Sequence, residues 1–303
     1  MMSIKLFPAE YGDCIMLSIG KGNQYNILID GGLSKTYQKY IKSEIQHIKE
    51  KRQKIGLLVC THMDNDHICG LIQVLKETNP DFIDNVWYNG FFQIVNSRFY
   101  SQKENYFTDR DNKILDEIIS QGVVSDSEQE IGINEGMSLG VLIEESKIPL
   151  NLVVEGRAIC SELVENRYEI ATNIFITVLG PSKNNIIELE DHWKKDMVSR
   201  NYMFRVSDKI KLTEAFEYQI ECIKSIYTNE SFKICENEDL TKYIGDLSER
   251  DESIVNRSSI SFILEYNKRK YLFLGDTVID KTILKNIENV VGFEYRFSAI
   301  KLP

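Results

Sequence analysis

The chain is organised around Cys60-Thr61-His62-Met63-Asp64-Asn65-Asp66-His67-Ile68-Cys69-Gly70. The apolar residues just before it, 55–59, predict a buried strand, and residues 71–76 predict the start of a helix. In a turn between a strand and a helix, closely spaced side chains can point toward one place. This turn carries four side chains that can bind a metal ion: His62, Asp64, Asp66 and His67.

Two imidazoles and two carboxylates so close together favour a divalent metal site, because zinc, manganese and iron accept both ligand types. The alternative is a polar loop in which Asp66 caps the following helix. A single His near a single Asp would favour that alternative. The density of such groups after a hydrophobic strand favours metal binding instead.

The stretch resembles the His-x-His-x-Asp-His motif of the metallo-β-lactamase superfamily, with Thr61 before it and Gly70 after it. Asp64 stands where the second His of that motif usually stands. This variant resembles the hydrolase domains of bacterial DNA-uptake competence proteins and of related hydrolases in bacterial defence loci. A carboxylate in place of an imidazole makes the site harder, so manganese and magnesium become candidates beside zinc.

The resemblance implies an α/β fold, the αββα sandwich of that superfamily with a mixed sheet core. It also implies a second motif, because Gly275-Asp276-Thr277 follows a predicted hairpin over 256–276 and looks like the superfamily's Gly-Asp element. In the family arrangement His62 and Asp64 bind one metal ion, Asp66 and His67 bind the other, and Asp276 bridges them. The alternative is that Asp276 caps a helix predicted over residues 279–287.

Further side chains are candidates for supporting positions. Asp30 ends a strand before Gly31-Gly32 and resembles the Asp of the superfamily's opening hairpin, which implies that it orients a ligating His. The alternative for Asp30 is an Asx turn that ends the strand. Asn89 and Asn256 are expected near the site. His192, on a helix predicted over 185–196, is a candidate third His, although a surface position is the more common place for such a residue.

Composition restricts the remaining possibilities. The chain has 303 residues, a net charge of −10, no apolar run of membrane-spanning length and no signal peptide at its start. We therefore expect a cytoplasmic protein without membrane association. Six cysteines with no paired spacing predict free thiols, and Cys60, at the end of a buried strand, is expected to pack rather than to bind metal.

The acidic charge is concentrated in one region. Residues 98–252 contain 18 Lys and Arg against 31 Asp and Glu. With no linker or repeat in view, we interpret residues 1–303 as one domain and 98–252 as an acidic elaboration inserted between the halves of its core. An acidic surface disfavours non-specific binding of nucleic acid and favours docking of a protein partner.

Periodicity predicts the other elements. Three strands are expected within residues 3–30, an amphipathic helix over 35–53, and a strand after Asp84. This order suits a sheet covered by helices on one face. Later helices are predicted over 113–121, 139–146 and 212–227, and a strand over 173–179.

The last residues, Lys301-Leu302-Pro303, resemble a segment that in related hydrolases is followed directly by His-His-Gly-Ser. From this we expect a C-terminally incomplete domain that lacks one metal-binding His. Such a domain would hold at most one well-occupied metal ion and show little activity, unless His192 or a partner chain supplies the missing ligand.

The sequence therefore predicts a metal-dependent hydrolase with zinc or manganese, up to two ions in the complete protein. The resemblance implies a phosphodiesterase or nuclease that uses a metal-bound hydroxide, with nucleic acid as a candidate substrate, Asp66 accepting a proton and a role in bacterial defence. The alternatives are hydrolysis of a small ester, amide or nucleotide, or a partner-binding subunit with an idle metal site.

Overall fold

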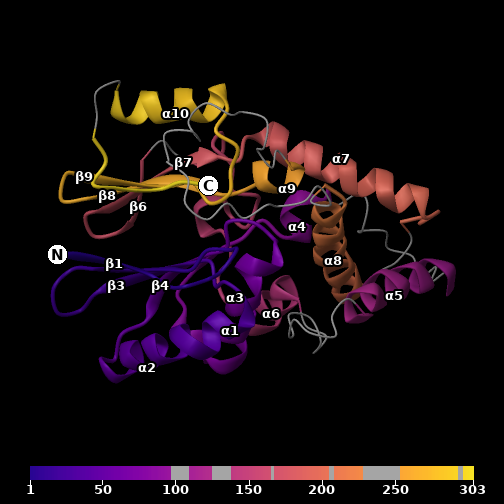
Figure 1. Cartoon of the computed structure of the whole chain (residues 1–303), viewed down its shortest axis with the longest axis horizontal. Coiled ribbons are helices and arrows are strands. Elements are labelled where there is room, and N and C mark those ends of the chain that lie inside the picture. Colours follow the sequence, from indigo (N-terminus) through magenta and orange to yellow (C-terminus); the bar gives the residue numbers. More distant parts are fainter. Residues whose placement is uncertain (97–108, 125–137, 165–166, 205–207, 228–252, 293–295) are drawn as a thin grey trace, which may run out of the picture.

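The computed structural model describes residues 1–96, 109–124, 138–164, 167–204, 208–227, 253–292 and 296–303. In that part of the chain two five-stranded sheets pack face to face, with helices on both outer faces (Figure 1). The order of layers is helix, sheet, sheet, helix. The fold is therefore the mixed αββα sandwich that the resemblance of the motif implied.

The first sheet comes from the N-terminal part of the chain. Its strands, in spatial order, are β1 (Met2–Leu6), β2 (Ile15–Ile19), β3 (Tyr25–Ile29), β4 (Ile55–Val59) and β5 (Val86–Trp87). The first three strands run antiparallel as a meander, whereas β3, β4 and β5 are parallel to one another. The carboxyl ends of β3 and β4 therefore lie side by side, which brings Asp30 next to the turn that carries the motif.

The second sheet combines a middle segment with the end of the chain. Its strands, in spatial order, are β10 (Ala299–Lys301), β9 (Arg269–Phe273), β8 (Ser261–Tyr266), β7 (Ile174–Gly180) and β6 (Tyr168–Ala171). Strand β10 pairs parallel with β9, and the other neighbours are antiparallel. The range 98–252 is thus no separate elaboration, because it contributes two core strands. Parts of that acidic range (98–108, 125–137, 228–252) lie outside the described residues.

Apolar residues at alternate positions hold the two sheets together. Leu57 and Val59 of β4 face Phe262 and Leu264 of β8 in the layer between the sheets. The intervening residue Ile263 points the other way and packs beneath the outer helix α10 (Lys281–Val291). Each sheet is thus apolar on both faces, as a sheet buried on both sides requires.

Helices cover the outer face of the first sheet. They are α1 (Ser34–Thr36), the π-helical turn η1 (Tyr37–Ile41), α2 (Lys42–Glu50) and α3 (Asn65–Glu77). A β-carbon on Gly70 of α3 would lie 1.9 Å from the carbonyl oxygen of Gly31, so only glycine permits this approach of helix and strand end. Helix α3 is therefore held directly against the carboxyl end of β3.

The remaining helices gather at one end of the sandwich (Figure 1). They are α4 (Phe91–Ile94), α5 (Asp109–Val124), α6 (Leu139–Ser146), α7 (Lys183–Ser199), α8 (Lys209–Tyr227) and α9 (Ile254–Arg257), with short 3-10 turns η2 (Pro80–Phe82) and η4 (Leu152–Val154). Trp193 of α7 packs edge to face against Phe91 and Phe216, which joins α7 to α4 and α8. Those three helices consequently share one aromatic core.

Glu217 of α8 is a buried carboxylate among these helices. It accepts hydrogen bonds from the hydroxyl of Tyr88 at 2.6 Å and from the backbone N–H groups of Leu139 and Gly140 at 2.9 and 2.8 Å. Burial raises the pKa of Glu217 to about 7. The side chain ties the start of α6 to the segment after β5, an interaction that sequence periodicity does not reveal.

Several expected boundaries were wrong. The strand expected from Asn256 begins only at Ser261, because the preceding residues form the short helix α9, where Ser253 accepts the N–H of Asn256. Neither proposed capping residue occupies an N-cap. Asp64 takes that position in α3, and Asp280 takes it in α10.

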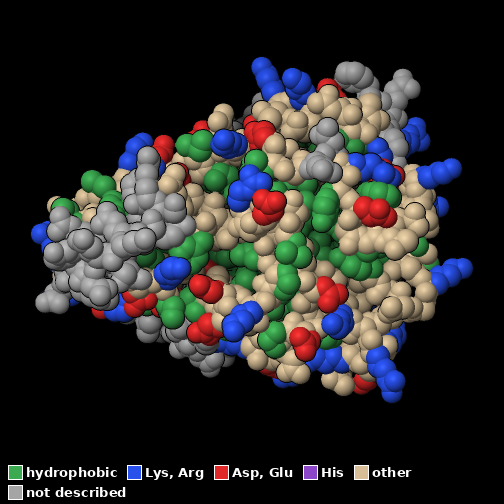
Figure 2. Space-filling model, turned by 180° about the vertical axis from the view of Figure 1, so that it is seen from behind, with side chains coloured by type: hydrophobic (Ala, Val, Ile, Leu, Met, Phe, Trp, Pro, Cys, Tyr) green, Lys and Arg blue, Asp and Glu red, His purple; other side chains and the backbone are tan. Residues whose placement is uncertain are grey.

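On the face shown in Figure 2, basic and acidic side chains are interspersed over the surface. No helix in the described part of the chain has the length and apolarity needed to cross a bilayer. The four cysteines of the described side chains, Cys14, Cys60, Cys69 and Cys160, are buried free thiols.

Candidate metal centre

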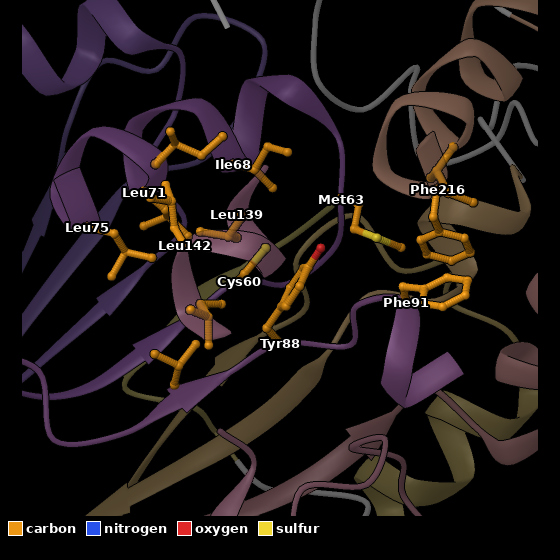
Figure 3. Packing of buried hydrophobic residues seen from close by; sticks show 14 of the residues in the cluster. Cys60, Met63, Ile68, Leu71, Leu75, Tyr88, Phe91, Leu139, Leu142 and Phe216 are labelled. Atoms are coloured by element: carbon orange, nitrogen blue, oxygen red, sulfur yellow. The ribbon is translucent and has the colours of Figure 1, made fainter. Parts of the chain in front are cut away.

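The motif turn is anchored by its own apolar residues. Cys60 and Met63 point into the core beside Tyr88, and Ile68 packs on the same side (Figure 3). The thiol of Cys60 donates to the carbonyl of His62 at 3.1 Å, and burial raises the pKa of this thiol well above its usual value. Cys60 therefore packs under the turn, as predicted, and its polar neighbours are left to face the opposite side.

His62, His67 and Asp276 converge on one point. Their ligand atoms all lie within 4.8 Å of one another, although Asp276 comes from the second sheet and the two histidines from the first. Nε2 of His67 lies 3.4 Å and Nε2 of His62 lies 3.9 Å from Oδ2 of Asp276. The centre thus spans the edge where both sheets meet.

Asp64 adds a fourth candidate ligand atom, a carboxylate oxygen, at the margin of this group. Its Oδ2 atom lies 3.1 Å from Nε2 of His62, and its side chain is buried. Ligands of one zinc or manganese ion at about 2.1 Å from it lie roughly 3 to 4 Å apart. The distances around His62 fit that spacing without rearrangement.

Asp30 fixes the orientation of both imidazoles. Its Oδ2 atom accepts from Nδ1–H of His67 at 3.0 Å and from the hydroxyl of Thr61 at 2.7 Å. Since the single Thr61 hydroxyl proton is used there, its oxygen accepts from Nδ1–H of His62, 2.9 Å away. Both rings are then protonated at Nδ1 when neutral, and both present an Nε2 lone pair to a metal ion.

The charged neighbours of His67 and Asp276 shift the pKa values of both side chains. Nε2 of His67 is buried and has no partner in hydrogen-bonding geometry. Burial alone lowers the pKa of His67, but the carboxylates of Asp30 and Asp276 outweigh it and hold the pKa well above its usual value. Burial likewise raises the pKa of Asp276, whereas the two imidazoles and Lys301 outweigh it and hold the pKa far below its usual range. The site is built for a cation at Nε2.

Asp66 stands one residue before His67 at the start of α3. It follows the N-cap of α3 in the first helical turn, and consecutive helical residues point about 100° apart, so Asp66 and His67 face different directions. Neither ligand group found among the described residues includes Asp66. The structure thus groups His67 with Asp276, and the expected pairing of Asp66 with His67 on one ion stays a prediction.

Asn89, Asn256 and His192 were also expected near the centre. Asn89 is fully engaged with Ile159, since its amide donates to that carbonyl at 2.8 Å and accepts that N–H at 2.7 Å. Asn256 is buried on α9. His192 is half-buried on α7, and it belongs to neither ligand group of the described residues.

Sequence reasoning placed Asp13 in the opening hairpin but gave it no role at the site. This residue precedes β2 and forms a second group with Asp30 and His67, again with ligand atoms within 4.8 Å of one another. The only signal was its place in the Gly12-Asp13 turn. A β-carbon on Gly12 would lie 1.7 Å from the backbone oxygen of Asp66, so this turn is pressed against the start of α3.

Comparison with known families agrees with this geometry. Residues 9–83 match the sequence model of the metallo-beta-lactamase superfamily. The match includes Asp13, Asp30 and the motif of α3, and it ends before the second sheet, which supplies Asp276. Members of that superfamily are in general metal-dependent hydrolases. No curated protein matches the chain.

Proposed function

We propose that this protein is a metal-dependent phosphodiesterase and, more specifically, a nuclease. The observation that carries the proposal is the convergence of His62, His67 and Asp276 with two Nε2 lone pairs directed to one point. A divalent ion held there by His62, His67 and Asp276 would supply Lewis acidity toward a scissile phosphoryl group and a water molecule.

The residues around that ion have separate tasks. Asp30 holds the imidazoles in one tautomer, Asp64 and Asp276 supply negative charge, and the buried imidazole rings exclude water from the back of the site. Carboxylates beside imidazoles favour manganese over a strict zinc site. The chemistry therefore suits hydrolysis of a phosphodiester, whose charge a hard cation binds well.

The substrate can be tested with a panel. Purified protein with Mn²⁺, Mg²⁺ or Zn²⁺ is incubated with single-stranded and double-stranded DNA, bis(p-nitrophenyl) phosphate and p-nitrophenyl butyrate. We expect Mn²⁺-dependent cleavage of the phosphodiesters. Because the chain carries a net charge of −10, cleavage of long DNA should be weak unless a basic partner is added.

Two results would redirect the proposal. Cleavage of the butyrate ester alone would favour a small-molecule esterase. Tight metal binding with no turnover of any compound, with or without partner, would favour a binding subunit that docks through its acidic region. The matched control is the His62→Ala/His67→Ala variant, which should remove all metal-dependent cleavage.

A further inference from the structure

A lysine lies at the open side of the metal centre. Nζ of Lys301, at the end of β10, donates to Oδ1 of Asp276 at 3.3 Å and to the carbonyl of Gly275 at 3.0 Å. It also forms an ion pair with Oδ2 of Asp13. The ammonium group therefore lies between two carboxylates, one from each half of the sandwich.

Asp276 is shared between this lysine and the imidazoles. Its Oδ2 atom faces Nε2 of His67, while its Oδ1 atom faces the ammonium of Lys301. A carboxylate shared by two metal ions can hold one ion on each of its oxygens. Here one oxygen is directed to the candidate metal position and the other is already occupied by a fixed positive charge.

We propose that Lys301 supplies the second positive charge of this centre, so that the centre holds one divalent ion, and that its ammonium binds an anionic phosphoryl oxygen of the substrate. The substrate part rests on the proposed function. The claim of a single ion is independent of the proposed function, because it follows from the position of the Lys301 ammonium beside Oδ1 of Asp276.

Exposure indicates the direction from which an anion arrives. The side chains of His62 and His67 are fully buried, whereas those of Asp13, Lys301 and Asp276 are 17%, 19% and 23% exposed. An anion approaching from that side meets the ammonium and the metal position together. Since the ammonium already has three acceptors, the anion must displace one, and the Asp13 carboxylate is its direct competitor.

The first experiment measures metal binding by equilibrium dialysis with elemental analysis. Wild type and Lys301→Arg should bind one Mn²⁺ per chain. Lys301→Gln should bind Mn²⁺ at least about tenfold more tightly or take up a second ion, because a like charge near the site is removed. The matched control is Lys270→Gln, which removes another half-buried lysine of the second sheet, bonded at 2.7 Å to the carbonyl of Val290.

The second experiment measures binding of inorganic phosphate to the Mn²⁺-loaded proteins by calorimetry. Lys301→Gln should lose affinity by at least about tenfold, and Lys301→Arg should stay within about threefold of wild type. Asp13→Asn should bind phosphate more tightly, since it removes the competing carboxylate. This variant also tests the proposal if Lys301→Gln fails to fold.

Three outcomes would overturn the inference. Two Mn²⁺ ions in the wild type would show that the lysine does not replace an ion. Weaker Mn²⁺ binding in Lys301→Gln would show that the lysine only holds Asp276 in position. Unchanged phosphate affinity in Lys301→Gln or Asp13→Asn would show that Lys301 does not bind the anion. Neither readout uses turnover, so a wild type that shows both responses but cleaves no phosphodiester would contradict the proposed function alone.

Discussion

Oδ2 of Asp30 accepts a hydrogen bond from Nδ1 of His67 at 3.0 Å, and both side chains are completely buried. The same oxygen accepts from Thr61, whose hydroxyl in turn orients His62. One carboxylate beneath the turn thus sets the tautomer of both imidazoles. Asp30 is directed away from the metal position, yet the metal affinity of the centre should depend on this residue.

Asp30→Asn tests this dependence. The amide keeps the shape of the carboxylate but removes its charge and offers N–H groups where two acceptors are needed. Mn²⁺ affinity should fall by about 10- to 100-fold, measured by calorimetry. Asp84→Asn, at an exposed carboxylate paired with Lys54, is the control and should bind as wild type does. Equal affinities in the two variants would contradict the assignment.

Removing both candidate ligands should abolish metal binding. The His62→Ala/His67→Ala variant is compared with His47→Ala/His192→Ala, which removes the remaining two histidines of the chain. Elemental analysis should find no bound metal in the first variant and wild-type content in the second. Circular dichroism of both should match wild type, because the two sheets and their cores do not depend on these rings. Retained metal in the first variant would refute the site.

Asp64 should set the metal preference. Asp64→His replaces an oxygen 3.1 Å from Nε2 of His62 by a softer imidazole nitrogen, so zinc affinity should rise relative to manganese. Competition between the two ions, followed by elemental analysis, gives the ratio directly. An unchanged or reversed ratio would count against Asp64 as a ligand.

Glu217 should make stability depend on pH. Its pKa is raised from 4.5 to about 7 in the folded chain, so the folded state holds the proton more tightly than the unfolded state. The free energy of unfolding should therefore fall as pH rises through this window, by about 3 kcal/mol at most. Urea unfolding should show this fall in wild type and in the control Glu288→Gln. Glu217→Gln should lack it, and an identical fall there would assign the effect to other groups.

Gly70→Ala should destabilise the fold around the centre. The added β-carbon would lie 1.9 Å from a backbone oxygen that cannot move aside, and overpacking of this kind costs about 1–3 kcal/mol or more. Urea unfolding gives the free energy of unfolding of Gly70→Ala, which is compared with that of the control Gln73→Ala on the same helix. Equal stabilities would mean that α3 can shift away from the end of β3.

The apolar strands and amphipathic helices are local patterns, and they predicted a sheet covered by helices on one face, whereas the αββα sandwich was implied by the resemblance of the motif. The sequence predicted the place of the centre because His62, Asp64 and His67 are close in the chain. The assignment of Asp66 came from the resemblance to the superfamily motif, and in α3, which starts at Asn65, Asp66 and His67 point about 100° apart. Which residue caps a helix depends on where the helix begins, and the local sequence pattern does not determine that residue.

Asp13 and Lys301 could not have been assigned from pattern. Lys301 lies in a segment that resembles related hydrolases, but that resemblance gives the lysine itself no role. The role of both residues comes from an ion pair across 288 positions, between a turn of the first sheet and the last strand of the second. The same holds for Glu217, whose partners Tyr88 and Leu139 belong to separate elements. Contacts between distant segments are decided by how the sheets pack.

Because the ligands come from both sheets, the order of events in folding is constrained. His62 and His67 can be placed by the first sheet, but Asp276 reaches them only after the second sheet, whose last strands end the chain, has docked. Contacts of such long sequence separation form late, since loop closure must precede them. Metal should therefore leave the refolding rate nearly unchanged and slow the unfolding rate, so that a bound ion acts mainly on the lifetime of the native state.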